Sequence, residues 1–116
     1  MKLFEILTEW KAPKFWYHGT SKKAYDKIVQ DGYLKPSLAD DEEFGSGVWF
    51  TPDFEYAANL MRGKMVVLAF DSKNLNQFRH TYSVKGAKDR EHYGSDLIIK
   101  QNIPLKFVKV VTKPIE

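Results

Sequence analysis

The apolar residues of the chain gather in short runs, and each run ends in a polar turn. Aromatic and β-branched side chains dominate these runs, which favours strands over helices. The pattern predicts strands at Phe15–Tyr17, Val48–Phe50, Met65–Phe70, Leu97–Ile99 and Leu105–Val111, with a turn at Gln101–Pro104 before the last of them. The run at Met65–Phe70 is continuous, so we expect it to be the central strand of a sheet.

Two internal segments carry apolar residues at helical spacing between recognisable start and stop signals. Ser21 is a typical N-cap and Gly32 a typical stop, so a helix is predicted between them. A second helix is predicted to start at Thr51-Pro52, with Thr51 as the cap, and to end at Gly63. The expected apolar faces are Ala24, Tyr25, Ile28 and Val29 in the first helix, and Phe54, Ala57, Ala58 and Met61 in the second.

Residues 1–14 are interpreted as a helical extension at the N-terminus. Leu3, Phe4, Leu7 and Trp10 fall on one helical stripe, and Pro13 follows them. This spacing predicts a short amphipathic helix that docks on the body of the protein.

The order of the predicted elements is typical of an α+β fold. Tyr33–Leu34 can add a short strand, and Lys35–Ser46 is predicted to be a polar loop. The stretch Asp71–Gly94 is long, polar and basic; a connection of that length is more often functional than idle, although short strands can lie inside it. With 116 residues the chain can bury a core, so we expect one domain, 1–116, with five or six short strands.

Composition excludes several classes of protein. The chain has no cysteine, which excludes a disulfide scaffold, a thiolate zinc site and a cysteine nucleophile. The three histidines, at 18, 80 and 92, lack the spacing of metal ligands. No apolar run approaches the length of a membrane span, and acidic residues interrupt the first ten positions, so we expect a cytoplasmic protein without a signal peptide. Phosphate-binding loops, dinucleotide fingerprints and the serine-hydrolase elbow are absent from the sequence.

The charge of the chain is unevenly distributed. Residues 1–60 carry 7 basic and 10 acidic side chains, a net −3, whereas residues 61–116 carry 11 basic and 5 acidic side chains, a net +6. A basic half is weak evidence for an anionic partner, and a merely solvated surface is the more common explanation.

Two strand ends carry residues suited to a binding site. The aromatic run at Phe15 leads into Tyr17–Thr20, where a histidine stands beside a glycine whose backbone can approach a ligand closely. Gly47–Thr51 repeats this succession of apolar strand, polar turn and helix. Rigid strand ends followed by loops are common places for sites, although a single histidine there is more often a partly buried turn residue.

These stretches, together with a third, resemble the ADP-ribosyltransferase superfamily in its histidine-type branch. Tyr17–Thr20 is similar to the first motif of that family, Gly47–Thr51 with its following helix to the second, and Ser95–Ile99, with a hairpin partner at Leu105–Val108, to the third. Small domains of this kind occur in phage polyvalent proteins and rifampin-modifying transferases. The resemblance covers residues 15–112 and implies a compact fold with a split, mostly antiparallel sheet and two or three helices.

The resemblance implies NAD as the substrate and assigns its site. His18 would bond a ribose hydroxyl, the backbone of Gly19 would hold the nicotinamide amide, and an acidic residue, here Asp96, would be catalytic together with His18. The implied NAD-binding residues are Tyr17, His18, Gly19, Thr20, Trp49, Phe50, Thr51 and Tyr56. The chain has Trp49 where the family usually has Tyr, and Asp96 where it usually has Glu, so an inactive relative is an alternative.

The chemistry of NAD cleavage fits one carboxylate near the sugar. Loss of nicotinamide builds an oxocarbenium-like ribose, which a carboxylate stabilises while it polarises the incoming nucleophile. We choose Asp96, expected to be part-exposed at a strand entry, with Glu91 in reserve.

The acceptor of the ADP-ribose is left open by the sequence. Arg79, Lys85, Lys88 and Arg90 stand where the family's acceptor-facing loop would be, and imply an anionic acceptor, either a protein or a nucleic acid. No membrane partner is expected, and a monomer is the default. One alternative is an RNA 2'-phosphotransferase-like NAD enzyme, based on Arg62–Leu68 and Asp71, although residues 1–14 are too short for the extra domain of those enzymes. Another alternative is a non-catalytic module that binds NAD or nucleic acid.

Overall fold

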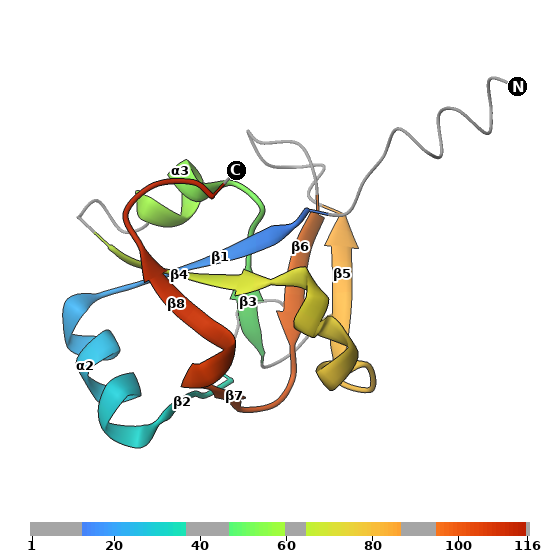
Figure 1. Ribbon diagram of the computed structural model, residues 1–116, viewed down its shortest axis with the longest axis horizontal. Coiled ribbons are helices and arrows are strands. Elements are labelled where there is room, and N and C mark those ends of the chain that lie inside the picture. The colour runs from blue at the N-terminus through green and yellow to red at the C-terminus, as the bar shows by residue number, and fades with distance from the viewer. Residues whose placement is uncertain (1–12, 37–46, 60–64, 87–94, 116) are drawn as a thin grey trace, which may run out of the picture.

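A computed structural model describes residues 13–36, 47–59, 65–86 and 95–115, which form three small antiparallel sheets with short helices around them (Figure 1). The α+β class predicted from the sequence is confirmed. The predicted N-terminal helix and most of the loop after Lys35 lie outside the described residues. Within the described ranges, none of the helices has the length and apolar character needed to cross a membrane.

The first sheet contains the strand that organises the site. Its order is β1 (Phe15–Thr20), β4 (Val66–Asp71) and β8 (Val108–Val111), so the continuous apolar run is the central strand, as predicted. β1 pairs with β4 along its whole length and places His18 opposite Leu68. Because β4 is covered on both faces, nearly all its side chains are buried, which explains why it lacks an apolar–polar alternation.

The second sheet has the order β3 (Val48–Phe50), β6 (Ser95–Ile99) and β5 (Tyr82–Gly86). The register of β5 and β6 places Lys85 directly opposite Asp96. β3 and the core of β6 lie where the sequence predicted strands.

The third sheet replaces the expected hairpin between β6 and the following strand. Ile103–Pro104, predicted as a turn, forms β7 and pairs with β2 (Tyr33–Leu34). The chain then makes a short 3-10 helix, η3 (Leu105–Phe107), and β8 joins β4 rather than β6. The hairpin prediction is therefore wrong, because pairing with β2 redirects the chain toward the other sheet.

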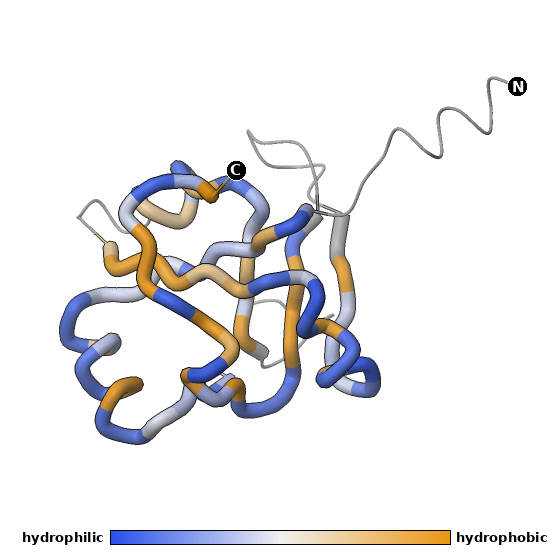
Figure 2. Tube along the Cα trace, viewed as in Figure 1, coloured by the Kyte–Doolittle hydropathy of each residue, from blue (hydrophilic) through white to orange (hydrophobic). Residues whose placement is uncertain are grey.

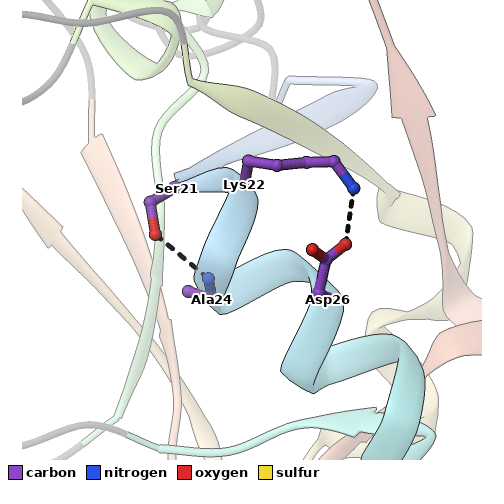
Figure 3. A network of polar contacts seen from close by, with 4 residues as sticks. All are labelled: Ser21, Lys22, Ala24 and Asp26. Atoms are coloured by element: carbon purple, nitrogen blue, oxygen red, sulfur yellow. Dashed lines mark hydrogen bonds and ion pairs between the residues drawn. The ribbon is translucent and has the colours of Figure 1, made fainter.

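The α2 helix (Lys22–Asp31) has the ends that the sequence predicts. The hydroxyl of Ser21 accepts a hydrogen bond from the backbone N–H of Ala24 at 3.1 Å (Figure 3). Gly32 ends the helix with φ of 85°, a left-handed conformation that glycine adopts without steric cost. Only part of the predicted apolar face is covered: Tyr25 and Ile28 pack on the core, whereas Val29 is 50% exposed.

The α3 helix (Phe54–Ala58) begins two residues later than predicted. Thr51 does not cap it, because the backbone N–H and C=O of Thr51 both bond to Tyr17 and hold it in an extended conformation. Asp53 is the cap, and its carboxylate accepts from the backbone N–H of Tyr56 at 3.2 Å. The helix has Asn59 as its C-cap, and the predicted stop at Gly63 lies outside the described residues.

One other boundary differs from the sequence-based prediction, and one long stretch that was left open contains two elements. β1 continues through His18 to Thr20 instead of turning after Tyr17, because β4 supplies a partner for each of those residues. The long stretch after Asp71, in which the sequence allowed short strands, contains a 3-10 helix, η2 (Ser72–Phe78), and then β5. Short polar strands such as β5 have a weak signal in the sequence.

Two apolar clusters lie on opposite faces of β1 and β4. The larger is built from Trp16, Leu34, Val48, Phe50, Leu68, Phe70, Phe78, Leu97, Ile99 and Ile103. The smaller, under α3, contains Tyr17, Phe54, Ala57, Val67 and Ala69. Figure 2 shows that apolar residues are concentrated in the strands, whereas α2 and η2 carry many hydrophilic residues. β1 thus separates the two clusters, and its side chains reach both.

Candidate functional site

The site lies where the first two sheets meet. The backbone N–H of Tyr17 donates to the carbonyl of Thr51 at 2.7 Å, and the N–H of Thr51 donates to the carbonyl of Tyr17 at 2.8 Å. This bridge joins β1 to the end of β3. It holds two strands from different sheets side by side and fixes the residues on either side of it.

A pocket of about 250 Å³ lies at this junction, and we call it the aromatic pocket. Its walls are formed by Tyr17, His18, Gly19, Trp49, Phe50, Thr51, Tyr56, Ala57 and Asp96. All three segments picked out in the sequence therefore contribute to one cavity. Seven of the eight residues predicted to bind NAD lie in its wall, together with the predicted catalytic carboxylate.

His18 is held in one tautomer by its neighbour across the junction. Its Nδ1 lies 2.7 Å from the carbonyl oxygen of Trp49, which can only accept, so Nδ1 carries the proton. Burial lowers the pKa of His18 below its ordinary value of 6.5, and the Trp49 carbonyl opposes this in part by favouring the charged form. The neutral ring therefore has an unprotonated Nε2, which can accept a hydrogen bond from a hydroxyl.

Gly19 brings the backbone of β1 against α3. A Cβ atom placed on Gly19 would lie 2.0 Å from the carbonyl oxygen of Ala57, so no other residue fits without displacing the helix. Backbone groups of alternate strand residues point to the same side. Since Tyr17 directs its N–H and C=O away from β4 toward Thr51, those of Gly19 point to that same side, along the wall of the aromatic pocket.

Tyr56 and Trp49 supply aromatic surface to the pocket from α3 and β3. Tyr56 is positioned by the Asp53 cap, whose side chain accepts from its backbone N–H. Asp53 and Ala57 are contributors that the sequence analysis did not assign to the site. The sequence did contain a signal for Asp53, because Asp is a common N-cap that accepts a hydrogen bond from the backbone N–H three residues further on.

Asp96 is the most deeply buried carboxylate among the described residues. It is the second residue of β6 and is 2% exposed, whereas the sequence analysis expected a part-exposed side chain. The reason is that β6 is the central strand of its sheet, with β3 on one side and β5 on the other. In its ionised form, a carboxylate in such a buried position acts strongly on a neighbouring charge, because little water screens it. The reserve candidate Glu91 lies outside the described residues.

A second pocket of about 370 Å³ shares His18 with the first, and we call it the helix pocket. Its other walls come from Thr20, Ala24, Lys27, Ile28, Asp31, Tyr33, Leu34, Lys35, Pro36 and Val48. Thr20 is the predicted NAD-binding residue that lies here instead of in the aromatic pocket. His18 thus forms part of the wall of both cavities.

The predicted acceptor-binding residues do not come from a single loop. Arg79 follows η2 and is exposed, and it precedes the end of β5 that pairs with Ile99. Lys85 lies at the other end of β5, opposite Asp96. Lys88 and Arg90 lie outside the described residues, so the acceptor role of the set stays a prediction.

Metal-binding clusters and other surface grooves are further candidates for a site. The described residues contain no group of three or more His, Asp or Glu side chains that could hold a metal ion. A wider groove of about 920 Å³ runs between α3, β4 and β8, and its lining is mainly apolar apart from Glu55, Asn59 and Thr112.

No protein-family model matches the chain, and no curated protein matches it at a significant level. The geometry of the two pockets, which share His18 in their walls, is therefore the basis for a functional proposal.

Proposed function

We propose that this chain is an NAD-dependent mono-ADP-ribosyltransferase, which releases nicotinamide and transfers ADP-ribose to an acceptor. The observation that carries the proposal is the convergence in one cavity of His18, Trp49 and Asp96, which belong to three separate segments of the sequence. Those are the residues that the resemblance to the family assigns to ribose binding, to the wall of the nicotinamide pocket and to catalysis.

The aromatic pocket suits nicotinamide in both shape and polarity. A flat ring can lie against Trp49 and Tyr56, and its carboxamide can pair with the N–H and C=O of Gly19. Such a pair of backbone bonds requires the open edge of a strand, which β1 presents beyond its bridge to Thr51. Gly19 serves this purpose because it has no side chain between the strand and α3.

Two pockets on either side of one shared residue suit a dinucleotide. NAD has a ring at each end, and a ligand that fills both pockets must cross His18. The unprotonated Nε2 of the neutral ring can accept from a ribose hydroxyl at that crossing point. In this arrangement nicotinamide fills the aromatic pocket and adenosine fills the helix pocket.

Asp96 then acts on the bond that breaks. The bond between C1' of the ribose and the nicotinamide nitrogen breaks, and its electron pair leaves with the now neutral nicotinamide. The ribose carries the positive charge, which the carboxylate of Asp96 stabilises. The acceptor's nucleophile bonds to C1', and its proton passes to solvent. Because the charge on the ribose is larger in the transition state than in bound NAD, this stabilisation raises the rate more than the affinity.

The acceptor is proposed to be anionic, a protein or a nucleic acid. The support is the basic second half of the sequence, with Lys85 in register with Asp96. A non-catalytic NAD-binding module is the alternative that the same pockets would serve.

Binding, release and transfer measurements test the proposal. NAD and nicotinamide are titrated into the protein with NMR or thermal-shift detection. Release of nicotinamide from labelled NAD, and transfer of the label, are then followed with and without an added cell lysate. We expect binding, slow release and transfer of label. Binding without release or transfer supports the non-catalytic module, and no response to NAD overturns the proposal.

The matched variant for these measurements is His18→Ala. It removes the shared wall of both pockets, so NAD affinity should fall while nicotinamide affinity changes less. Asp26→Asn, on the exposed side of α2, is the control that should behave as wild type.

A further inference from the structure

The helix pocket contains a carboxylate that the proposed chemistry does not use. Asp31 is the last residue of α2 and lies in the pocket wall. Its Oδ2 is 3.9 Å from the ammonium nitrogen of Lys27 and 3.8 Å from that of Lys35. The Asp31 side chain is 22% exposed, compared with 60% for Asp26 on the same helix.

This position is electrostatically unfavourable for an acid. The C-terminal end of a helix is the negative end of its dipole, so a carboxylate there is destabilising and a cation is favoured. Lys27 and Lys35 offset that cost, and both are mostly solvated, at 70% and 56% exposed. The stability of the helix therefore does not account for an acid at this position, and Asp31 lies in the wall of a pocket.

The two lysines leave the carboxylate available as an acceptor. Distances of 3.8 and 3.9 Å exceed those of a hydrogen bond, so the ammonium groups neutralise charge without donating directly to Oδ2. A ligand hydroxyl that enters the pocket can therefore donate to Asp31.

We propose that Asp31 binds the adenosine ribose of NAD through its 2'- and 3'-hydroxyls and selects NAD against NADP. The inference rests on the proposed function, since it takes the helix pocket as the adenosine end of the site. A ribose diol presents two adjacent donors, which match the two oxygens of one carboxylate. In NADP the 2'-hydroxyl is replaced by a phosphate, which has no comparable donor and repels the carboxylate.

The neighbouring residues agree with this assignment. Tyr33 lines the same pocket, with the Lys35 ammonium group 5.7 Å from the centre of its ring, and it offers a flat surface for the adenine base. The lysines do not make the pocket a phosphate site, because both charges are directed at Asp31 and are exposed to water. The Asp31 carboxylate, at 22% exposed, is the least exposed of the three charged groups.

The test compares three dinucleotides on the full chain: NAD, NADP and an NAD analogue that lacks the adenosine 2'-hydroxyl. We expect wild-type protein to prefer NAD over NADP by about tenfold or more, both in Kd and in the rate of nicotinamide release. Asp31→Asn should lower the preference to about threefold or less. The deoxy analogue should bind wild type more weakly than NAD does, and Asp31→Asn should weaken its binding less than that of NAD, because only the 3'-hydroxyl remains to donate to Asp31.

Asp26→Asn is the matched control. Asp26 belongs to the same helix and pairs with Lys22 at 2.5 Å in the same i,i+4 relationship (Figure 3). It is not among the residues that line the helix pocket. It should keep the wild-type preference. If wild-type protein binds NAD and NADP equally, or if Asp31→Asn keeps the full preference, the inference is wrong and the proposed function stands. If neither dinucleotide binds or is cleaved, both are wrong.

Discussion

The imidazole of His18 donates its Nδ1 proton to the carbonyl oxygen of Trp49 across the junction of two sheets, at 2.7 Å. This hydrogen bond fixes the orientation of the His18 ring, on β1, relative to the backbone of β3. Burial also keeps the ring neutral by lowering its pKa below 6.5. A neutral ring with a fixed tautomer is a pre-organised acceptor for a ribose hydroxyl, and its protonation has measurable consequences.

The first prediction concerns the stability of the fold as a function of pH. The pKa of His18 is lower in the folded chain than its ordinary value of 6.5 in the unfolded chain. At pH values between these two pKa values, the unfolded state therefore binds more protons than the folded state. The contribution of His18 to the free energy of unfolding is therefore complete above 6.5 and is lost as pH falls through that window. Urea titrations at several pH values should show this loss in wild type, and His18→Gln should lack it. A wild-type curve parallel to that of the variant contradicts the assignment.

The second prediction concerns Asp96→Asn. It preserves size and removes the negative charge, so the rate of nicotinamide release should fall by about a hundredfold, while the affinity for NAD changes much less. Because Asp96 is 2% exposed, the change should also cost about 1–3 kcal/mol in the free energy of unfolding, more than an exposed carboxylate would. Single-turnover kinetics and urea unfolding measure the two effects.

Glu91→Gln is the comparison for this prediction, and it should keep full turnover. If Glu91→Gln loses turnover and Asp96→Asn keeps it, the catalytic role belongs to Glu91. Full turnover in both variants would remove the carboxylate from the mechanism.

The third prediction concerns Gly19→Ala. The added Cβ would lie 2.0 Å from the carbonyl oxygen of Ala57, and neither backbone can move without disturbing β1 or α3. We expect a loss of about 1–3 kcal/mol in the free energy of unfolding, together with weaker nicotinamide binding. Unfolding by urea and titration with nicotinamide check it. Wild-type stability and affinity in this variant would show that α3 is not held against the strand.

The fourth prediction separates the stability of a helix from its effect on the site. Asp53→Ala removes the cap of α3 and Ser21→Ala the cap of α2, and each should cost about 1 kcal/mol in the free energy of unfolding. Only Asp53→Ala should also weaken nicotinamide binding, because its hydrogen bond positions Tyr56. Equal affinity in the two variants would mean that Tyr56 is placed by other contacts.

The fifth prediction concerns the basic residues of the second half of the chain. Lys85 is in register with Asp96, whereas Arg79 precedes the opposite end of β5. Lys85→Glu should therefore reduce transfer to an anionic acceptor more than Arg79→Glu does, in a salt-dependent way, and both should keep NAD hydrolysis. Labelled-NAD transfer and hydrolysis assays distinguish these effects. Equal loss of transfer and hydrolysis in Lys85→Glu would assign that residue to the fold.

Features that depend on residues close together in the chain were predictable from the amino-acid pattern. The Ser21 cap and the Gly32 stop of α2 are local hydrogen-bond and dihedral effects, and both occur where the sequence predicts them. The cores of the main strands are equally local, because runs of β-branched and aromatic residues favour extended backbone. The central place of β4 was also predictable, since the continuous apolar run Met65–Phe70 is typical of a strand covered on both faces.

The meeting points of those elements depend on long-range contacts, which the amino-acid pattern does not show. Thr51 looks like a helix cap in the sequence, but its backbone groups bond to Tyr17, which is distant in the chain, and the cap moves to Asp53. Likewise, no local pattern shows that β8 leaves β6 for β4. The burial of Asp96 and the position of Asp31 in a pocket beside His18 also come from long-range pairing of strands. The reason is physical: cap and strand propensities act over a few residues, whereas the choice of strand partner depends on the packing of the whole core.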